Sequence, residues 1–312
     1  MTSKDISPVS RRKFISLAAT AGVSMAGIVP GNAFAHTKNI TIREAIDIII
    51  KSIPVAPIDN TVDTVKAGNP DQVLKGIVTT TFATIEVIEK AAALGANFII
   101  AHEPTFYNHR DDTDWLDQDK VLEYKQQLIQ KTGIVIWRFH DYWHSDMPDG
   151  VLTGVLRMLD WQRFTTPGKE NIVHIAGATF GSVLKEVKQK LKIPFVKAIG
   201  MPGDSCEKIL LMPGAEGGRA QITAIEKEQP GLLICGELQE WETSEYIRDA
   251  RRKGDKISLM VLGHSVSEEP GMVWLVSWLK PKLPGIAVTH IASRSPFTWY
   301  SFLKDKIDRP DQ

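Results

Sequence analysis

The sequence predicts an α/β protein built from two similar lobes of strands and helices. Apolar residues at helical spacing alternate along the chain with short apolar runs. The short runs are almost continuously apolar, which is typical of strands in a sheet that helices cover on both faces. One helix–strand pattern, at residues 88–103, recurs more faintly at residues 225–237 and indicates a second, similar lobe.

The first lobe is expected to contain two helix–strand pairs. Residues 84–94 carry apolar side chains at helical spacing, and residues 97–101 form a short apolar run after a glycine. Residues 119–131 predict a second helix that ends before Gly133, and residues 134–139 predict a second buried strand.

The second lobe is expected to begin near residue 171. A Thr-Thr-Pro-Gly-Lys segment before it predicts a boundary between an N-terminal lobe, residues 36–165, and a C-terminal lobe, residues 166–312. The strands of this lobe are expected at residues 172–176, 208–212, 231–235 and 257–262, and its helices at residues 183–191, 218–227 and 269–279. We interpret residues 213–218 as a tight strand-to-helix turn, with a phosphate-binding loop as the alternative.

The first 35 residues have the layout of an export signal. Arg11, Arg12 and Lys13 precede a weakly apolar run rich in Ala and Gly, which ends in Ala33-Phe34-Ala35. The paired arginines resemble the twin-arginine type, and the run is too short and too rich in Gly for a membrane span. We expect cleavage after Ala35 and a periplasmic protein with no stable membrane anchor; the alternative is a disordered basic tail.

Charge and cysteine content exclude several classes of protein. The whole chain has 37 basic and 37 acidic residues, and loss of residues 1–35 leaves 33 basic and 36 acidic residues. This lack of basic excess argues against nucleic-acid binding. Two cysteines, Cys206 and Cys235, are too few for a thiolate zinc site, and they form either one disulfide or two buried thiols.

Polar side chains gather where three predicted strands end. The three clusters are His102-Glu103, residues 140–144 and residues 263–268. Because ligands of open α/β sheets bind beyond the carboxyl ends of the strands, these clusters are expected to converge. His264 and Glu268 stand four residues apart, so they share one face if residues 265–268 open the following helix.

Imidazole and carboxylate side chains together favour a divalent ion such as zinc, manganese or iron. His102 and Glu103 are adjacent and point apart, so they suit two ions, and a carboxylate can bridge such a pair. Each cluster also has a structural interpretation: a histidine after a strand is often a capping or solvent-facing residue, and Glu268-Glu269-Pro270 is a good helix start. The joint placement of all three clusters favours the metal site.

Several segments, in order, resemble the Nif-three-like dinuclear metal-centre family, the NGG-one-interacting-factor-three proteins, also labelled GTP cyclohydrolase 1 type 2 homologues. The matching segments are residues 68–78, 84–100, 102–104, 140–144, 236–238 and 263–268. The resemblance implies two α/β lobes with mixed sheets flanked by helices, a metal site in the cleft between the lobes, and assembly into a homohexamer.

The resemblance also implies two divalent metal ions in each subunit, with Glu268 bridging them. The implied ligands are His102, Glu103, His144, His264 and Glu268. Glu103 stands where the family usually has His, and His144 stands where it has Asp. Phe82 and Glu240-Trp241 depart from the family pattern in the same way, so the substrates of relatives do not transfer directly to this chain.

Two close divalent ions suit hydrolysis, and we expect an exported metal-dependent hydrolase of a small cyclic or (phospho)ester substrate. A non-catalytic metal-binding protein or metallochaperone is the alternative, and cyclohydrolase-like ring opening is a third interpretation. Candidates for acid–base catalysis are Glu240 and His109, with Glu237 beside them, and candidates for substrate binding are Tyr107, His140, Trp143 and Trp241. Each of these has a plainer interpretation as a surface, core or oligomer-contact residue.

Overall fold

The computed structural model describes residues 39–146 and 148–300. The predicted export signal, residues 1–35, lies outside the described residues. Among the described helices, none is long and apolar enough to cross a membrane.

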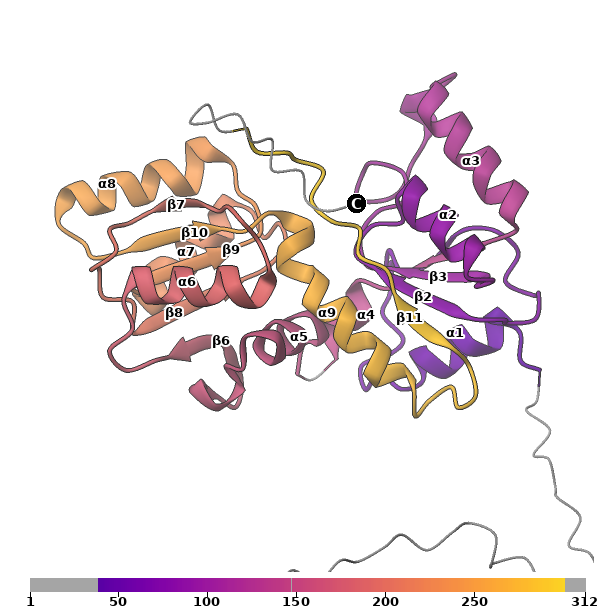
Figure 1. The fold of residues 1–312 in the computed structure, drawn as a ribbon, viewed down its shortest axis with the longest axis horizontal. Helices are drawn as coiled ribbons and strands as arrows, with labels where there is room; N and C mark the ends of the chain where they lie inside the picture. The colour runs from indigo at the N-terminus through magenta and orange to yellow at the C-terminus, as the bar shows by residue number, and fades with distance from the viewer. Residues whose placement is uncertain (1–38, 147, 301–312) are drawn as a thin grey trace, which may run out of the picture. The chain divides into compact units, whose positions relative to one another are not determined.

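The first sheet has five strands in the order β1-β4-β3-β2-β11 (Figure 1). Its strands are β1 (Val65–Ala67), β2 (Ile77–Thr80), β3 (Phe98–Ala101), β4 (Val135–Arg138) and β11 (Val288–His290). The four strands from β4 to β11 run parallel, and β1 pairs antiparallel with β4 at the edge. The sheet is therefore mixed, as expected.

Helices cover both faces of this sheet. They are α1 (Ile42–Ile50) on one face and α2 (Ile85–Ala93) with α3 (Lys120–Thr132) on the other. Phe98 and Ile100 of β3 pack with α1, whereas Ile99 packs with α2 and α3. Successive side chains of a strand point to opposite faces, so burial on both faces explains why the strand is apolar throughout.

The second sheet has six strands in the order β5-β6-β8-β9-β10-β7. They are β5 (Thr165–Thr166), β6 (Lys169–His174), β7 (Lys197–Ile199), β8 (Lys208–Met212), β9 (Leu232–Cys235) and β10 (Ser258–Val261). The central strands β8, β9 and β10 are parallel, and antiparallel strands flank them. This sheet is also mixed.

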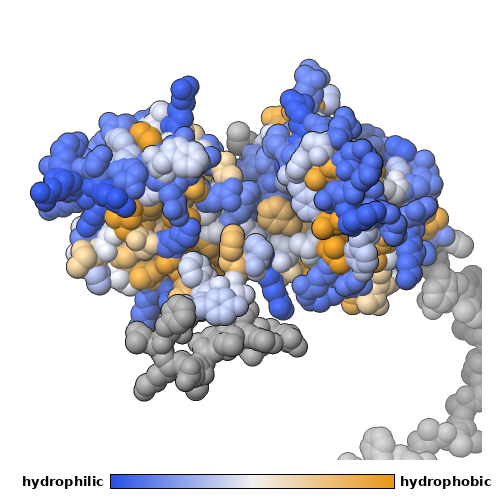
Figure 2. Space-filling view, turned by 90° about the horizontal axis from the view of Figure 1, so that it is seen from above, coloured by the Kyte–Doolittle hydropathy of each residue, from blue (hydrophilic) through white to orange (hydrophobic). Residues whose placement is uncertain are grey.

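The second sheet is likewise covered on both faces. Residues of α5 (Gly150–Leu159) and α6 (Phe180–Leu191) share one buried cluster with its strands, and residues of α7 (Gly218–Glu228) and α8 (Glu245–Lys253) share another. The face of the molecule in Figure 2 is mainly hydrophilic, with smaller apolar areas between charged residues. Most large apolar side chains are thus used in the cores.

The chain crosses between the two sheets twice, and one helix of each crossing passes close to the other. The chain leaves the first sheet through α4 (Asp141–Ser145) and α5, and returns to it through α9 (His264–Leu279) and β11 (Figure 1). A Cβ atom on Gly154 of α5 would lie only 2.4 Å from the Cα atom of Gly271 in α9. The backbones approach closely there because both positions lack a side chain.

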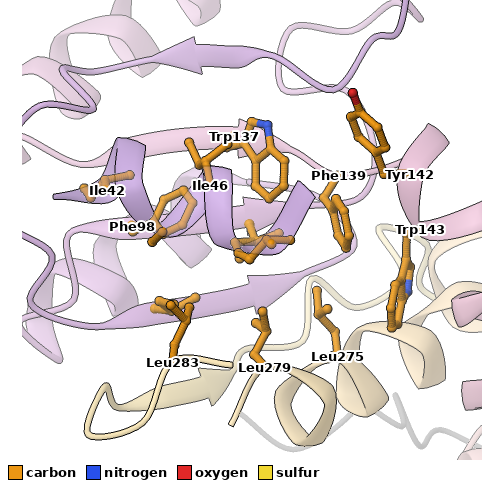
Figure 3. Close-up of a cluster of buried hydrophobic side chains, with 14 of the residues drawn as sticks. Ile42, Ile46, Phe98, Trp137, Phe139, Tyr142, Trp143, Leu275, Leu279 and Leu283 are labelled. Carbon is orange, nitrogen blue, oxygen red and sulfur yellow. The ribbon is translucent and has the colours of Figure 1, made fainter. Parts of the chain in front are cut away.

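Leu275 and Leu279 of α9 enter the core of the first sheet, beside Phe139 and Trp143 (Figure 3). The same helix carries His264 and Glu268 in its first two turns. Packing of α9 on the first sheet therefore places these two side chains near the ends of β3 and β4.

The predicted helix at residues 269–279 begins earlier than expected, at His264. Pro270 lies inside this helix, so the prediction that Glu268-Glu269-Pro270 starts it was wrong. The conditional prediction that residues 265–268 open the helix is confirmed.

Cys206 and Cys235 are buried and free, so the disulfide alternative was wrong. Burial raises the pKa of the Cys206 thiol to about 11 and that of the Cys235 thiol to about 12.

Candidate metal centre

All three polar clusters come together at the carboxyl ends of parallel strands. His102 and Glu103 directly follow β3, and His140 lies two residues after β4, at the start of α4. His264 and Glu268 belong to the beginning of α9, after β10. The local reason is the same in each case: a short buried strand ends, and the next residues turn away from the sheet.

Two carboxylates lie among the imidazoles. The Oε1 atom of Glu103 is 3.5 Å from Nε2 of His140 and 3.5 Å from Nε2 of His264. The Oε2 atom of Glu268 is 3.1 Å from Nε2 of His264, and its Oε1 atom is 3.8 Å from Nε2 of His102. Residues from both sheets therefore face one small volume.

Three histidine rings form a second part of the same group. The ring centroids of His102, His140 and His144 are 4.8 to 4.9 Å apart. One ring nitrogen from each lies within 4.8 Å of the others, and His102, Glu103 and Glu268 form an overlapping group by the same measure. Both groups have the residue types and spacing of a divalent-metal site.

Three of the four histidines have a hydrogen-bond partner with an oxygen atom at Nδ1. The partners are the Phe139 carbonyl for His102 (3.1 Å), Asp141 for His140 (2.8 Å) and Asp149 for His144 (2.8 Å), whereas Nδ1 of His264 has the Glu237 carboxylate as a charged neighbour at 3.5 Å. In a neutral imidazole, a proton on Nδ1 leaves the Nε2 lone pair free. Metal-binding histidines in proteins are oriented by outer acceptors of this kind.

Several atoms facing this volume are buried without a hydrogen-bond partner. They are Nε2 of His102, Nε2 of His264 and Oε2 of Glu268. Buried polar atoms are almost always satisfied, so an unsatisfied group of this size needs an explanation. Divalent cations would give these atoms partners, and the residues present therefore fit the metal that the sequence predicts.

The pKa values of the histidines differ according to their neighbours. Burial lowers the pKa of His102 well below its usual value, and burial also lowers the pKa of His140. For His144, burial acts in the same direction, but the hydrogen bond and charge of Asp149 raise its pKa to about 9. His264 has a pKa raised to about 11 because the Glu103 and Glu268 carboxylates outweigh burial.

The two carboxylates repel each other. Burial, with the nearby charge of Glu103, raises the pKa of Glu268. Burial also opposes ionisation of Glu103, but the His264 imidazole 3.5 Å away and the charges of the surrounding histidines hold its pKa well below the usual range. The site therefore attracts positive charge, whether protons or metal ions.

Arg138 lies fully buried beneath this site. Its Nη2 atom is 3.6 Å from Oε2 of Glu103, and its Nε atom donates a hydrogen bond to the carbonyl of His102 at 3.1 Å. Another carboxylate, that of Asp111, lies 3.8 Å from Nη1, and Lys66 pairs with Asp111 at 3.2 Å. These alternating charges compensate one another in the interior.

Asp63 holds the backbone of the segment that carries His140 and His144. Its carboxylate accepts backbone N–H groups of His140 and Asp141 through Oδ1, at 2.8 and 3.0 Å, and of Tyr142 through Oδ2, at 2.8 Å. These bonds cap α4 and fix where His140 and His144 leave the backbone.

The loop predicted as a tight turn, residues 213–218, also borders the site. Gly214 has a φ of +71°, and a Cβ atom there would lie 2.1 Å from Oε1 of Glu268. Its N–H group donates to the side chain of Ser267 at 2.9 Å. Glycine is required at this position both by the backbone and by the closeness of the Glu268 carboxylate.

The structure places the five predicted metal ligands and His140 in one group. Of the other predicted site residues, His109 lies nearby, with its ring 5.9 Å from that of His140. Trp143 is fully buried in the core, where Figure 3 shows it near Leu275.

Three further candidates have their contacts elsewhere. Trp241 is 77% exposed, and Glu240 is paired with Lys197 at 2.9 Å. Tyr107 is half-exposed and lies by Lys125. None of these three residues belongs to the two candidate metal groups of the described residues.

The fold and this site define a class: a mixed α/β protein with a buried group of histidines and carboxylates that could bind a divalent metal. Comparison of families identifies the chain more narrowly. It belongs to the Duf34/NIF3 (NGG1p interacting factor 3) family, whose model matches residues 40–296. The family resemblance seen in the sequence is thereby confirmed. No curated protein matches the chain.

Solved structures with this fold cover most of the chain. A Bacillus cereus protein related to NIF3 has a TM-score of 0.69 and 14% identity, over 84% of this chain and 100% of its own. The protein ybgI, described as of unknown function, has a TM-score of 0.66 and 18% identity, over 83% and 100%. Reduced HcgD from Methanocaldococcus jannaschii has a TM-score of 0.59 and 14% identity, over 80% and 97%. These similarities show the fold.

Proposed function

We propose that this chain is an exported, dinuclear metal-dependent hydrolase of a small cyclic or (phospho)ester substrate. One observation carries the proposal. Four imidazoles, three of them with a hydrogen-bond acceptor at Nδ1, face two buried carboxylates, and buried atoms on both kinds of side chain lack hydrogen-bond partners. Outer acceptors and free Nε2 atoms are what a metal centre requires of its ligands.

The side chains that would hold the metal are His102, Glu103, His144, His264 and Glu268. When bound, two divalent ions polarise a substrate oxygen and lower the pKa of water towards neutrality. Zinc, manganese and iron all accept this mixture of imidazole and carboxylate. Periplasmic location, which the sequence predicts, and homohexameric assembly, which the family resemblance implies, belong to the same proposal.

The chain itself supplies orientation and charge. Asp149 and Asp141 hold imidazoles in one tautomer, and Arg138 holds Glu103. His109 is the candidate for exchanging a proton with the substrate, because its ring lies 5.9 Å from that of His140, at the edge of the site. Glu240 is less suited, because its carboxylate is already paired with Lys197.

A second function, metal storage or delivery without catalysis, is favoured by the depth of the site. His102 is fully buried and Glu268 is 2% exposed. Deep burial slows the entry of a substrate more than that of a small ion. Cyclohydrolase-like ring opening remains a third reaction to include in any substrate screen.

The test uses the mature protein and two site variants. Glu268→Gln and His264→Ala are expected to lose bound metal and, with it, hydrolysis of ester, phosphoester and cyclic amide substrates. Glu240→Gln is the matched control and is expected to keep both. Hydrolysis by the metal-free protein would overturn the proposal. Metal that exchanges readily, with no turnover across the substrates, would favour the delivery function instead.

A further inference from the structure

His102 belongs to both candidate metal groups, but it cannot serve two ions. Its Nδ1 atom is bonded to the carbonyl of Phe139, so only Nε2 has a free lone pair. One imidazole nitrogen binds one metal ion. The two groups, His102-His140-His144 and His102-Glu103-Glu268, therefore cannot both be filled as they stand.

The three-histidine group has the geometry of imidazoles around a single ion. Metal–nitrogen bonds of about 2 Å and near-tetrahedral angles place the ring centroids of three ligating histidines about 5 Å apart. In this structure all three centroid distances, among His102, His140 and His144, are 4.8 to 4.9 Å. A chance pair of histidines can meet at such a distance, but three nearly equal separations, with one ring nitrogen of each within 4.8 Å of the others, match imidazoles arranged around one ion.

His140 has the same outer support as its two neighbours. Its Nδ1 atom is 2.8 Å from Asp141, and its backbone is fixed by Asp63. Only 22% of its side chain is exposed, so most of the ring is unavailable to a substrate. These contacts suit a metal ligand better than the substrate-binding role that the sequence indicates.

The remaining side chains form a complementary group. Nε2 of His264 is 3.1 Å from Glu268 and 3.5 Å from Glu103. When His102 is assigned to the three-histidine group, one imidazole and two carboxylates remain for a second ion.

We propose that His140 is a sixth metal ligand, and that the centre is asymmetric: one ion bound by His102, His140 and His144, the other by His264, Glu103 and Glu268. Glu268 then binds one ion, in place of the bridging role that the family resemblance implies. The assignment rests on the proposed dinuclear function. Three neutral imidazoles favour zinc or cobalt, and the carboxylate-rich position favours a harder ion such as manganese. The two positions should therefore differ in metal preference.

The first experiment counts ions and needs matched histidine variants. Apo protein is loaded with Co²⁺, and bound cobalt is measured for the wild type, His140→Gln and His109→Gln. We expect two ions in the wild type and in His109→Gln, and loss of one ion in His140→Gln, or weakening of it by ~10-fold or more. Two ions bound to folded His140→Gln with wild-type affinity would overturn the assignment.

A second measurement needs no variant, so it holds even if His140→Gln does not fold. In the cobalt-loaded wild type, each ligating histidine with a proton on Nδ1 gives one strongly shifted, exchangeable proton NMR signal. Four signals are expected if His140 is a ligand. Three signals with two bound ions would overturn only the role of His140, whereas a wild type that binds no metal would overturn the proposed function.

Discussion

The two carboxylate oxygens of Glu103 have different surroundings. Oε1 faces the Nε2 atoms of His140 and His264, whereas Oε2 faces the buried guanidinium of Arg138. Arg138 therefore leaves one oxygen for a metal ion and holds the other. The positive charge of Arg138 compensates the negative charge of the Glu103 carboxylate in the interior.

Arg138→Lys is expected to weaken metal binding about tenfold, because lysine cannot reproduce the fork that contacts Glu103 and the His102 carbonyl. The measurement is the metal dissociation constant, obtained by competition with a chelator. Arg251→Lys is the matched control: Arg251, in α8, pairs with Asp204 at 2.9 Å. Equal metal affinity in both variants would contradict a positioning role for Arg138.

Metal binding should depend on pH through two histidines. Nearby carboxylates raise the pKa of His144 to about 9 and that of His264 to about 11, outweighing burial in both cases. Both imidazoles are therefore protonated at neutral pH in the metal-free protein, and an ion must displace their protons. Apparent affinity should rise about tenfold per pH unit for each proton displaced, up to about pH 9 for His144. Calorimetric titration with metal, in buffers of different ionisation enthalpy, counts the protons that the protein releases on binding. If metal binding released no protons between pH 6 and 8, this explanation would be contradicted.

At the residue scale, site residues that directly follow a strand can be predicted from the sequence. Residues whose partners lie far away in the sequence are harder to predict. His102, Glu103, His264 and Glu268 were found because they end or follow apolar runs. Asp63 was missed because its partners are almost 80 residues away and nothing in its local sequence marks it. Arg138 is a lone charged residue within an apolar strand, and the sequence shows this. Its buried partner, Glu103, follows the neighbouring strand and becomes evident only from the structure.

Among the elements, α5 and α9 determine how the two halves of the site meet. α5 follows the segment that carries His144 and Asp149, and α9 carries His264 and Glu268. Their backbones approach at Gly154, where an added Cβ atom would lie 2.3 Å from the carbonyl oxygen of Pro270. Backbone atoms cannot move aside as a flexible side chain can.

Gly154→Ala is therefore expected to push α5 and α9 apart, at a cost of about 1–3 kcal/mol in the free energy of unfolding. The same displacement should weaken metal binding. Gly203→Ala is the control, because a Cβ atom there would meet nothing within 4 Å. Chemical denaturation of both variants measures the effect, and unchanged stability of Gly154→Ala would show that the helices accommodate the methyl group.

The helices that the sequence analysis identified have a clear apolar face and a clear end. α2 and α3 begin at capping side chains, Thr84 and Asp119, and were predicted to within about two residues. α9 was predicted to start too late because it is apolar on several sides and contains Pro270. Its buried apolar residues pack in the core of the first sheet and its backbone lies against α5, and its start becomes clear only from those contacts.

For the molecule as a whole, the chain passes from the first sheet to the second and returns. β11, near the C-terminal end of the described residues, pairs with β2 of the first sheet. The predicted boundary between residues 36–165 and 166–312 stays a prediction, and the first sheet contains four strands from the former part and β11 from the latter. A metal centre built from both sheets needs this return, because α9 lies on the way back to β11.

Export is a prediction about the whole chain that the described residues do not reach. Replacing Arg11 and Arg12 by lysine should retain the protein in the cytoplasm, because the twin-arginine pathway reads the arginine pair. Cell fractionation and the N-terminal sequence of the mature protein measure this. Periplasmic protein cleaved after Ala35 is expected from the wild type, and an uncleaved cytoplasmic wild type would contradict the prediction.

The central claim, an asymmetric dinuclear centre, is tested most directly by anomalous diffraction from crystals of the metal-loaded mature protein. Two peaks are expected about 3.5–4 Å apart. One should lie among His102, His140 and His144, and the other between His264 and the two carboxylates. A single peak, or peaks away from these side chains, would contradict the account.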